Sequence, residues 1–275
     1  MLSRWNFFVG LSLIILSLWG LFARNPWWEQ YYFAFAWIGW VFFVDALAFG
    51  RWKTSLFSRL GYRVLALFIL SVPFWLLYSL LNLHLGLWTT SHACASFVGD
   101  FFYGASHSAV LPGILVTLNF FLPDVSPLMP DQTLSLRAAR IWVFFGIASF
   151  LLALGAGRLF FPLIFCFLAL LLDPINYFGG RPSLLFALQK RRWRPLLLFC
   201  LSALVIGLFW ESLNGVTGGG WSYRLPYFNF DDVFAMPLLG LLGYIPFAAS
   251  AFAFVIWFES LLSPGSLLDA GKKIT

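Results

Sequence analysis

The chain has 275 residues, of which 61% are hydrophobic, 21% aromatic and only 10% charged. A soluble globular domain carries about 25% charged residues, so this chain cannot cover a water-facing surface and its main solvent is lipid. The net charge of +6 does not indicate a nucleic-acid partner, because the basic residues stand in short bursts between apolar runs, with no basic helix face or nucleic-acid motif. The composition therefore predicts an integral membrane protein.

Eight apolar runs are long enough to cross the hydrocarbon layer as helices, which takes roughly 17–25 residues each. The runs are continuous rather than alternating, which favours helices over barrel strands. In chain order they cover residues 5–23, 31–49, 62–82, 98–121, 141–157, 159–178, 195–213 and 233–258. The fifth is the weakest, because it is short and only "GAGR" separates it from the sixth. We expect an all-α polytopic transmembrane helix bundle of about eight spans.

The basic residues are divided unevenly between the two ends of these runs. With the N-terminus inside, the inner segments hold 14 of the 17 Lys and Arg residues, and the outer loops hold only Arg24, Arg158 and Arg224. Cytoplasmic segments of membrane proteins carry such an excess of Lys and Arg. We therefore expect a multi-pass protein of the inner (cytoplasmic) membrane with both termini in the cytoplasm.

The two halves of the chain resemble each other. "FFVDALAFGRWKTSLF" matches "LLLDPINYFGGRPSLL", so that Asp45 aligns with Asp173 and Ser55 with Ser183. Farther along, "NLHLGLWTTS" matches "NGVTGGGWSY" through an asparagine and a tryptophan, and the next run in each half has an early proline: Asn82, Asn214, Trp88, Trp221, Pro112 and Pro237.

This similarity predicts a tandem repeat of two four-helix halves, residues 1–121 and 137–258. A Pro- and Ser-rich cytoplasmic linker, 122–136, joins them, and a cytoplasmic tail, 259–275, follows. An even number of spans gives both halves the same orientation, related by an axis along the membrane normal.

Polar side chains gather at the predicted outer ends of the spans. Asp100, Tyr103 and His107 share one helix face, since they stand at positions i, i+3 and i+7. If the halves pack about their axis, that face and Glu211 meet at an outward-opening cavity, where Glu211 follows the apolar pair Phe209 and Trp210. A carboxyl in such surroundings keeps its proton and can act as a general acid.

The candidate catalytic residues are therefore Glu211, His107 and Asp100. The candidate ligand-binding residues are Asn82, Trp88, Trp210, Asn214, Trp221 and Tyr223. The alternative is structural: Glu211 and Asn214 hydrogen-bond a helix end or each other, and His107 is an interior histidine. Asp45 and Asp173 have the same two interpretations, as backbone-binding carboxyls or as contacts to lipid headgroups.

The sequence indicates no metal site. Asp100, His92 and His107 have ligand chemistry but no recognised spacing. The three cysteines, Cys94, Cys166 and Cys200, are widely spaced, which supports neither a disulfide framework nor a zinc site. No residue pattern identifies a cofactor.

Residues 209–247 resemble small integral-membrane lycopene cyclases, whose repeats carry a pattern like W-(D/E)…G-x-W-(T/S)-(F/Y)-x-P…P-x-E-E. The matching positions are Trp210, Glu211, Gly219, Trp221, Ser222, Tyr223, Pro226, Met236 and Pro237, with a fainter echo in Trp75, Asn82, Trp88 and Pro112. The match covers about a third of the chain. The acid pair believed to protonate the polyene in the cyclases is replaced here by Leu239 and Gly240. The resemblance thus implies a related scaffold and an isoprenoid-like ligand, without the acids of cyclase chemistry.

The chain is also similar as a whole to a family of bacterial multi-pass membrane proteins with no assigned activity, through "LLLDPINYFGGRPSLL" and "MPLLGLLGYIPF". Three functions follow as hypotheses. The first is binding or modification of an isoprenoid- or carotenoid-like lipid in the outer half of the bilayer. The alternatives are a non-catalytic subunit or scaffold with a partner in a membrane complex, and a transporter of a small solute or lipid.

Overall fold

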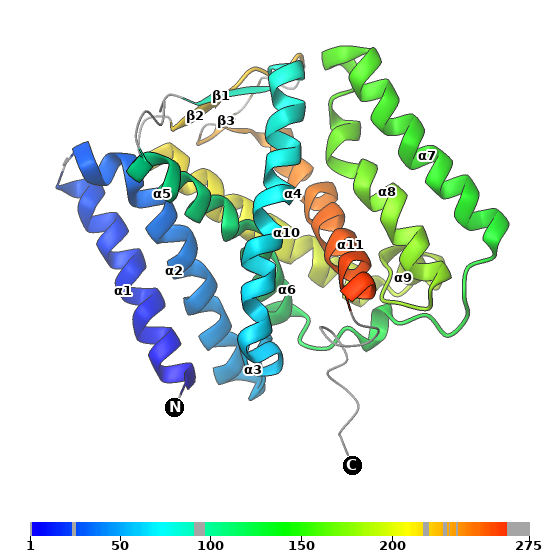
Figure 1. Cartoon of the computed structure of the whole chain (residues 1–275), viewed down its shortest axis with the longest axis horizontal. Helices are drawn as coiled ribbons and strands as arrows, with labels where there is room; N and C mark the ends of the chain where they lie inside the picture. Colours follow the sequence, from blue (N-terminus) through cyan, green and yellow to red (C-terminus); the bar gives the residue numbers. More distant parts are fainter. Residues whose placement is uncertain are drawn as a thin grey trace.

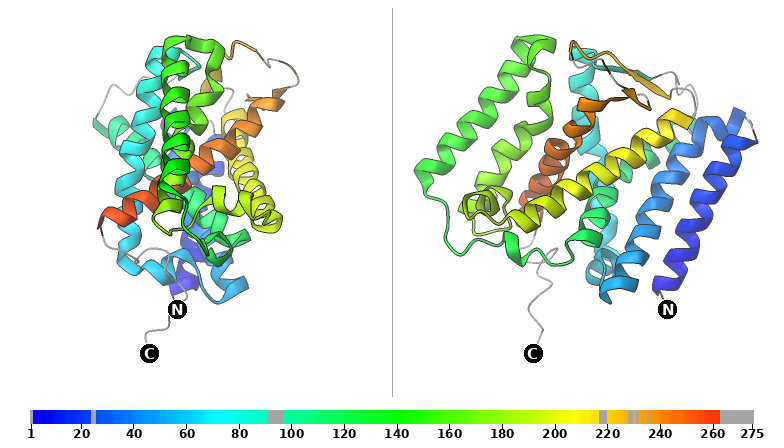
Figure 2. Two further views of the ribbon diagram at one scale, coloured as in Figure 1. Left: turned by 90° about the vertical axis from the view of Figure 1, so that its right-hand side faces the viewer. Right: turned by 180° about the vertical axis from the view of Figure 1, so that it is seen from behind.

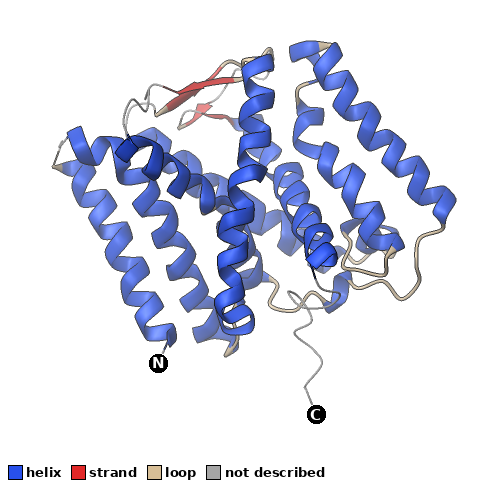
Figure 3. Ribbon diagram, viewed as in Figure 1, coloured by secondary structure: helices blue, strands red, loops and turns tan. Residues whose placement is uncertain are grey.

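Helices form nearly all of the described part of this chain, in a computed structural model that describes residues 2–23, 26–90, 97–216, 220–227, 230, 232–234 and 236–262 (Figures 1 and 3). The α-helices are α1 (Leu2–Phe22), α2 (Pro26–Trp52), α3 (Leu56–Leu60), α4 (Val64–Leu85), α5 (Phe97–Ser108), α6 (Val110–Phe121), α7 (Leu136–Gly155), α8 (Pro162–Phe178), α9 (Leu184–Gln189), α10 (Trp193–Val216) and α11 (Tyr244–Leu262). Four short strands are β1 (Trp88–Thr90), β2 (Trp221–Tyr223), β3 (Asp232–Val233) and β4 (Met236–Pro237), and 3-10 turns include η4 (Leu238–Gly243).

Seven helical segments in the described part of the chain are long and apolar enough to cross a membrane: Arg4–Phe22, Tyr31–Trp52, Leu56–Leu85, Gly104–Phe121, Leu136–Gly155, Trp193–Gly215 and Leu238–Leu261. The predicted sixth span, α8, is a shorter apolar helix of 17 residues. The predicted fifth span, which is the weakest in the sequence, forms a regular helix of 20 residues, α7. The expectation of an all-α multi-pass membrane bundle is confirmed.

The predicted fourth span is interrupted, because α5 ends at Ser108 and α6 begins at Val110. Ser71 of α4 inserts its hydroxyl into the break. Its Oγ donates to the carbonyl of His107 (2.5 Å) and accepts from the N–H of Leu111 (3.0 Å). These two backbone groups would bond each other in an unbroken helix, so the serine replaces that one helical hydrogen bond.

The predicted eighth span starts later than its apolar run. The strand pair β3 and β4 and the turn η4 come first, and α-helix begins only at Tyr244. Pro237 lacks an N–H, and the glycines at 240 and 243 disfavour regular helix, which accounts for the delay.

Two helix pairs form the opposite sides of the bundle, α1 with α2 and α7 with α8, and the remaining long helices lie between them (Figures 1 and 2). At the centre α6 packs against α2, α4 and α10, and it is buried from Val110 to Asn119. The strands β1 and β2 lie at one end of the bundle, here called the ribbon end, and the N-terminus lies at the other (Figure 1).

Two matched polar clusters lie at the end away from the ribbon. Asp45 accepts hydrogen bonds from the Ser55 hydroxyl (2.9 Å) and from the N–H of Phe57 (2.9 Å). Asp173 accepts from the Ser183 hydroxyl (2.7 Å) and from two backbone N–H groups, those of Leu184 (3.0 Å) and Leu185 (2.8 Å). Each serine also caps a short helix, α3 or α9. Both buried carboxyls thus fasten the start of a helix to the preceding span.

Candidate ligand-binding cavity

A two-stranded ribbon joins the two halves of the chain. Strands β1 and β2 pair antiparallel, with Trp88 opposite Tyr223, Thr89 opposite Ser222 and Thr90 opposite Trp221. The central pair also joins its side-chain hydroxyls at 3.1 Å. The ribbon therefore brings the tryptophans of both predicted repeats to one place.

An asparagine at the end of a long helix holds each of these tryptophans. Asn82 Oδ1 accepts from the backbone N–H of Trp88 (3.0 Å), and its Nδ2 donates to the Trp88 carbonyl (2.8 Å). Asn214 makes the same two bonds to the backbone of Trp221, at 3.0 and 2.9 Å. Because these amides bond the ribbon backbone and do not line the cavity described next, the structure gives them the role of backbone clamps.

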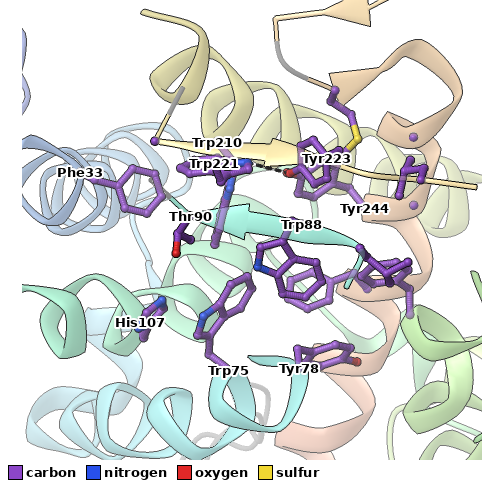
Figure 4. A pocket seen from close by; sticks show the side chains of 18 of the residues that line it. Phe33, Trp75, Tyr78, Trp88, Thr90, His107, Trp210, Trp221, Tyr223 and Tyr244 are labelled. Atoms are coloured by element: carbon purple, nitrogen blue, oxygen red, sulfur yellow. Dashed lines mark hydrogen bonds between the residues drawn. The ribbon is translucent and has the colours of Figure 1, made fainter. Parts of the chain in front are cut away.

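Beside the ribbon lies a cavity of about 520 Å³ (Figure 4). This size falls within the range of about 300–1,000 Å³ found for small-molecule sites. Its wall comes from both halves of the chain and is mainly aromatic, with Phe33, Trp75, Tyr78, Trp88, Trp210 and Trp221 among the lining residues. The lining residues also carry hydroxyls and one imidazole, in Tyr31, Tyr32, Tyr78, Thr90, Ser106, His107, Tyr223 and Tyr244.

The aromatic wall is closely packed. The indole of Trp75 stacks on the His107 ring, with ring centroids 5.3 Å apart and planes 13° apart, and lies 5.0 Å from the indole of Trp210. Phe33 contacts Trp210 edge-on at 5.4 Å and Trp221 at 5.2 Å. The packing fixes the orientation of these rings, so the wall is preformed.

Glu211 lies directly behind this wall. Its Oε1 accepts hydrogen bonds from the hydroxyls of Tyr223 (2.6 Å) and Tyr244 (2.5 Å), and the indole N–H of Trp221 donates to the Tyr223 oxygen (2.9 Å). Glu211 is fully buried and is not among the described residues that line the cavity. The two phenols therefore stand between the carboxyl and any ligand.

Tyr223 keeps its proton in this arrangement. Desolvation at its position, followed by the neighbouring Glu211 carboxyl, raises the pKa of the Tyr223 phenol well above its ordinary value. The phenol is consequently a stable hydrogen-bond donor to Glu211 at neutral pH.

Gly207 makes room for Tyr244. A Cβ at position 207 would lie 2.5 Å from the Tyr244 ring, closer than real Cβ contacts allow. Gly207 and Glu211 are four residues apart in α10, so they face the same side of the helix. The tyrosine ring crosses α10 at the glycine and reaches the carboxyl one turn later.

The residues predicted for the site fall into three groups. Four of the candidate ligand-binding residues line the cavity, Trp88, Trp210, Trp221 and Tyr223, as does the candidate catalytic residue His107. Glu211, Asn82 and Asn214 support the wall from behind. The side chain of Asp100, together with His92, Cys94 and Gly219, lies outside the described residues.

Sequence reasoning did not find Tyr244, the second phenol on Glu211. The signal that could have identified it is its place in "MPLLGLLGYIPF", seven residues after Pro237. Among the described residues no three His, Cys, Asp or Glu side chains come together in a way that could hold a metal ion.

Leu239 and Gly240 also line the cavity. A Cβ at Gly240 would lie 2.5 Å from the Met236 sulfur. The thioether thus occupies the space that a side chain at position 240 would need.

No family model, no curated protein and no solved structure matches this chain.

Proposed function

We propose that this protein binds an elongated, isoprenoid-like lipid in the cavity beside the ribbon. The observation that carries the proposal is the preformed aromatic cavity of about 520 Å³ at the junction of the two halves. Rigid aromatic side chains provide a large apolar contact area at low conformational cost, which suits a flexible hydrocarbon chain. The resemblance of residues 209–247 to lycopene cyclases supports the same class of ligand.

The proposal places the protein in the inner membrane, with both termini in the cytoplasm and the ribbon end facing outward. The basic segments support this orientation: the N-terminus, α3 and α9 lie at the end away from the ribbon (Figure 1). The ligand would then enter from the outer half of the bilayer.

Binding is favoured over cyclisation by the chemistry of the wall. Apolar Leu239 and Gly240 stand where the cyclases carry acids, and Glu211 reaches the cavity only through two phenols. Glu211 acts in this proposal as a positioning residue: it fixes Tyr223 and Tyr244, whose rings and oxygens face the ligand.

Transport is the second candidate, because the break between α5 and α6 is a device that transporters use to expose backbone groups to a solute. Here the Ser71 hydroxyl already pairs the two freed groups. These two groups are therefore not free to coordinate a solute, which favours binding.

Lipid that co-purifies with the protein tests the proposal. The wild type is extracted in mild detergent and its lipids are compared by mass spectrometry with those of the bulk membrane. We expect enrichment of a prenyl or polyene lipid, lost in Ala34→Leu, which fills part of the cavity from buried Ala34 on α2. The matched control is Ala66→Leu, the same change at an exposed position on α4.

Bulk phospholipid alone, in the same proportions for the wild type and both variants, would contradict lipid binding. A fixed partner protein that co-purifies without an enriched lipid would instead support a subunit of a membrane complex.

A further inference from the structure

Three tryptophans that line the cavity have unused hydrogen-bond donors. Trp221 donates its indole N–H to Tyr223, whereas no hydrogen bond from the indole N–H of Trp75, Trp88 or Trp210 is found within the part of the chain that the structure describes. Trp210 is 7% exposed, so bulk water does not reach it freely. A ligand that fills the cavity takes water away from these donors, and a donor that is then left without any partner is costly.

These three indoles lie together. The ring of Trp75 is 5.0 Å from that of Trp210 and 6.3 Å from that of Trp88. Figure 4 shows the three around one space, with Thr90 and His107 at its edge. The three donors are thus concentrated in one part of a mainly aromatic wall.

We propose that the ligand carries an uncharged oxygen group, a hydroxyl or a carbonyl, that accepts hydrogen bonds from this indole cluster. The inference rests on the proposed function and narrows it, because it excludes a pure hydrocarbon as the preferred ligand. Such a hydrocarbon fills the aromatic part of the cavity but leaves all three indole donors unpaired.

An anionic group on the ligand is disfavoured by the lining, and a cationic group leaves the indole donors unpaired. The described lining contains no Lys or Arg that would pair with a carboxylate or phosphate, and the Glu211 carboxyl stands behind the wall. An ammonium group brings only donors, so it cannot pair with an indole N–H. An alcohol or ketone satisfies the indoles without either conflict.

Three ligands with the same branched carbon skeleton test the inference: phytol, an alcohol that also has one double bond; phytane, the saturated hydrocarbon; and phytanic acid, a carboxylate at neutral pH. The full-length protein in phospholipid nanodiscs is incubated with all three, re-isolated and analysed by mass spectrometry, with empty nanodiscs as the partition control. We expect about tenfold more phytol than phytane or phytanic acid retained per protein, corresponding to one or two hydrogen bonds.

The variant Trp210→Phe keeps an aromatic wall but removes one donor. It should lower phytol retention about three- to tenfold more than phytane retention, because only the alcohol loses a hydrogen bond. The matched control, Trp5→Phe, makes the same change at a residue that is 66% exposed on α1 and should alter neither.

The outcomes separate this inference from the proposed function. If phytane is retained as well as phytol or better, and Ala34→Leu lowers that retention, the oxygen group on the ligand is overturned and lipid binding is kept. Preferential retention of phytanic acid overturns the uncharged ligand. Retention of none of the three above empty nanodiscs overturns both proposals.

Discussion

The two halves of the molecule share their scaffold hydrogen bonds and differ in the cavity wall. Asp45 and Asp173 bind a serine and backbone N–H groups in the same way, and Asn82 and Asn214 clamp the same atoms of a tryptophan. At the second position after the clamped tryptophan, however, the first half has Thr90 and the second has Tyr223.

The difference extends to the carboxyl. Three residues before the clamping asparagine, the first half has Ser79 and the second half has Glu211. Only the second half therefore builds the carboxyl–phenol cluster. The polar residues common to both halves therefore bond the backbone. Glu211 and Tyr223, which have no counterpart in the first half, form the polar cluster at the cavity wall.

The largest effects are expected at the shared aspartates. Asp173→Ala leaves a serine hydroxyl and two backbone N–H groups without their acceptor, and each such loss costs about 1–3 kcal/mol. We expect at least about 3 kcal/mol lost from the free energy of unfolding, measured by denaturation in detergent, and slightly less for Asp45→Ala. If one of these two substitutions destabilised the protein strongly and the other had no effect, the two aspartates would not have equivalent roles.

The asparagine clamps should follow. Asn82→Ala and Asn214→Ala each remove both side-chain bonds to a ribbon tryptophan, so we expect about 2 kcal/mol of destabilisation from either. Unfolding in detergent gives the measurement. If one variant were as stable as the wild type and lost only ligand retention, that asparagine would contact the ligand directly.

Gly207→Val tests the carboxyl–phenol cluster, which only the second half has. The added side chain displaces the Tyr244 ring and separates it from Glu211, at a cost of about 1–3 kcal/mol for overpacking. We expect the retained lipid, as a fraction of the wild-type amount, to fall more than the free energy of unfolding falls as a fraction of its wild-type value. Tyr244→Phe is the control, because it removes the hydroxyl and keeps the ring. Wild-type retention in both variants would show that the carboxyl–phenol cluster does not support the cavity.

The smallest effect concerns pH. The pKa of Tyr223 is raised by desolvation and then by Glu211, so the folded protein keeps a proton that the unfolded chain loses above about pH 10. Its contribution to stability is complete below that pH and is lost as the pH rises further. We expect the unfolding free energy to be insensitive to this residue from about pH 6 to 9 and to decrease above about 10. Tyr223→Phe should weaken that decrease; an identical pH profile would contradict the assignment.

The bundle itself could be predicted because a membrane helix is a local property. A continuous apolar run of sufficient length satisfies its own backbone, so the sequence located α1, α2, α4, α7 and α10. Trp88, Trp210, Trp221 and Tyr223 were predicted for the site from the aromatic character of two matched segments, and they line the cavity.

The remaining features depend on contacts between distant segments. The break after Ser108 requires a hydroxyl from Ser71, 36 residues before the carbonyl it binds at His107. The position of Glu211 behind the wall depends on Tyr244, which comes from the next helix. Sequence spacing identified a buried acid near aromatic residues and could not show that two phenols would cover it.

An electron cryo-microscopy structure of the full chain, extracted from its native membrane into nanodiscs without added ligand, tests the central claim most directly. Lipid binding predicts one elongated density in the cavity, along Trp75, Trp210 and Trp221, with its polar end at the indole cluster. A cavity that is closed by its own side chains, or that holds only separate water-sized densities, would contradict lipid binding.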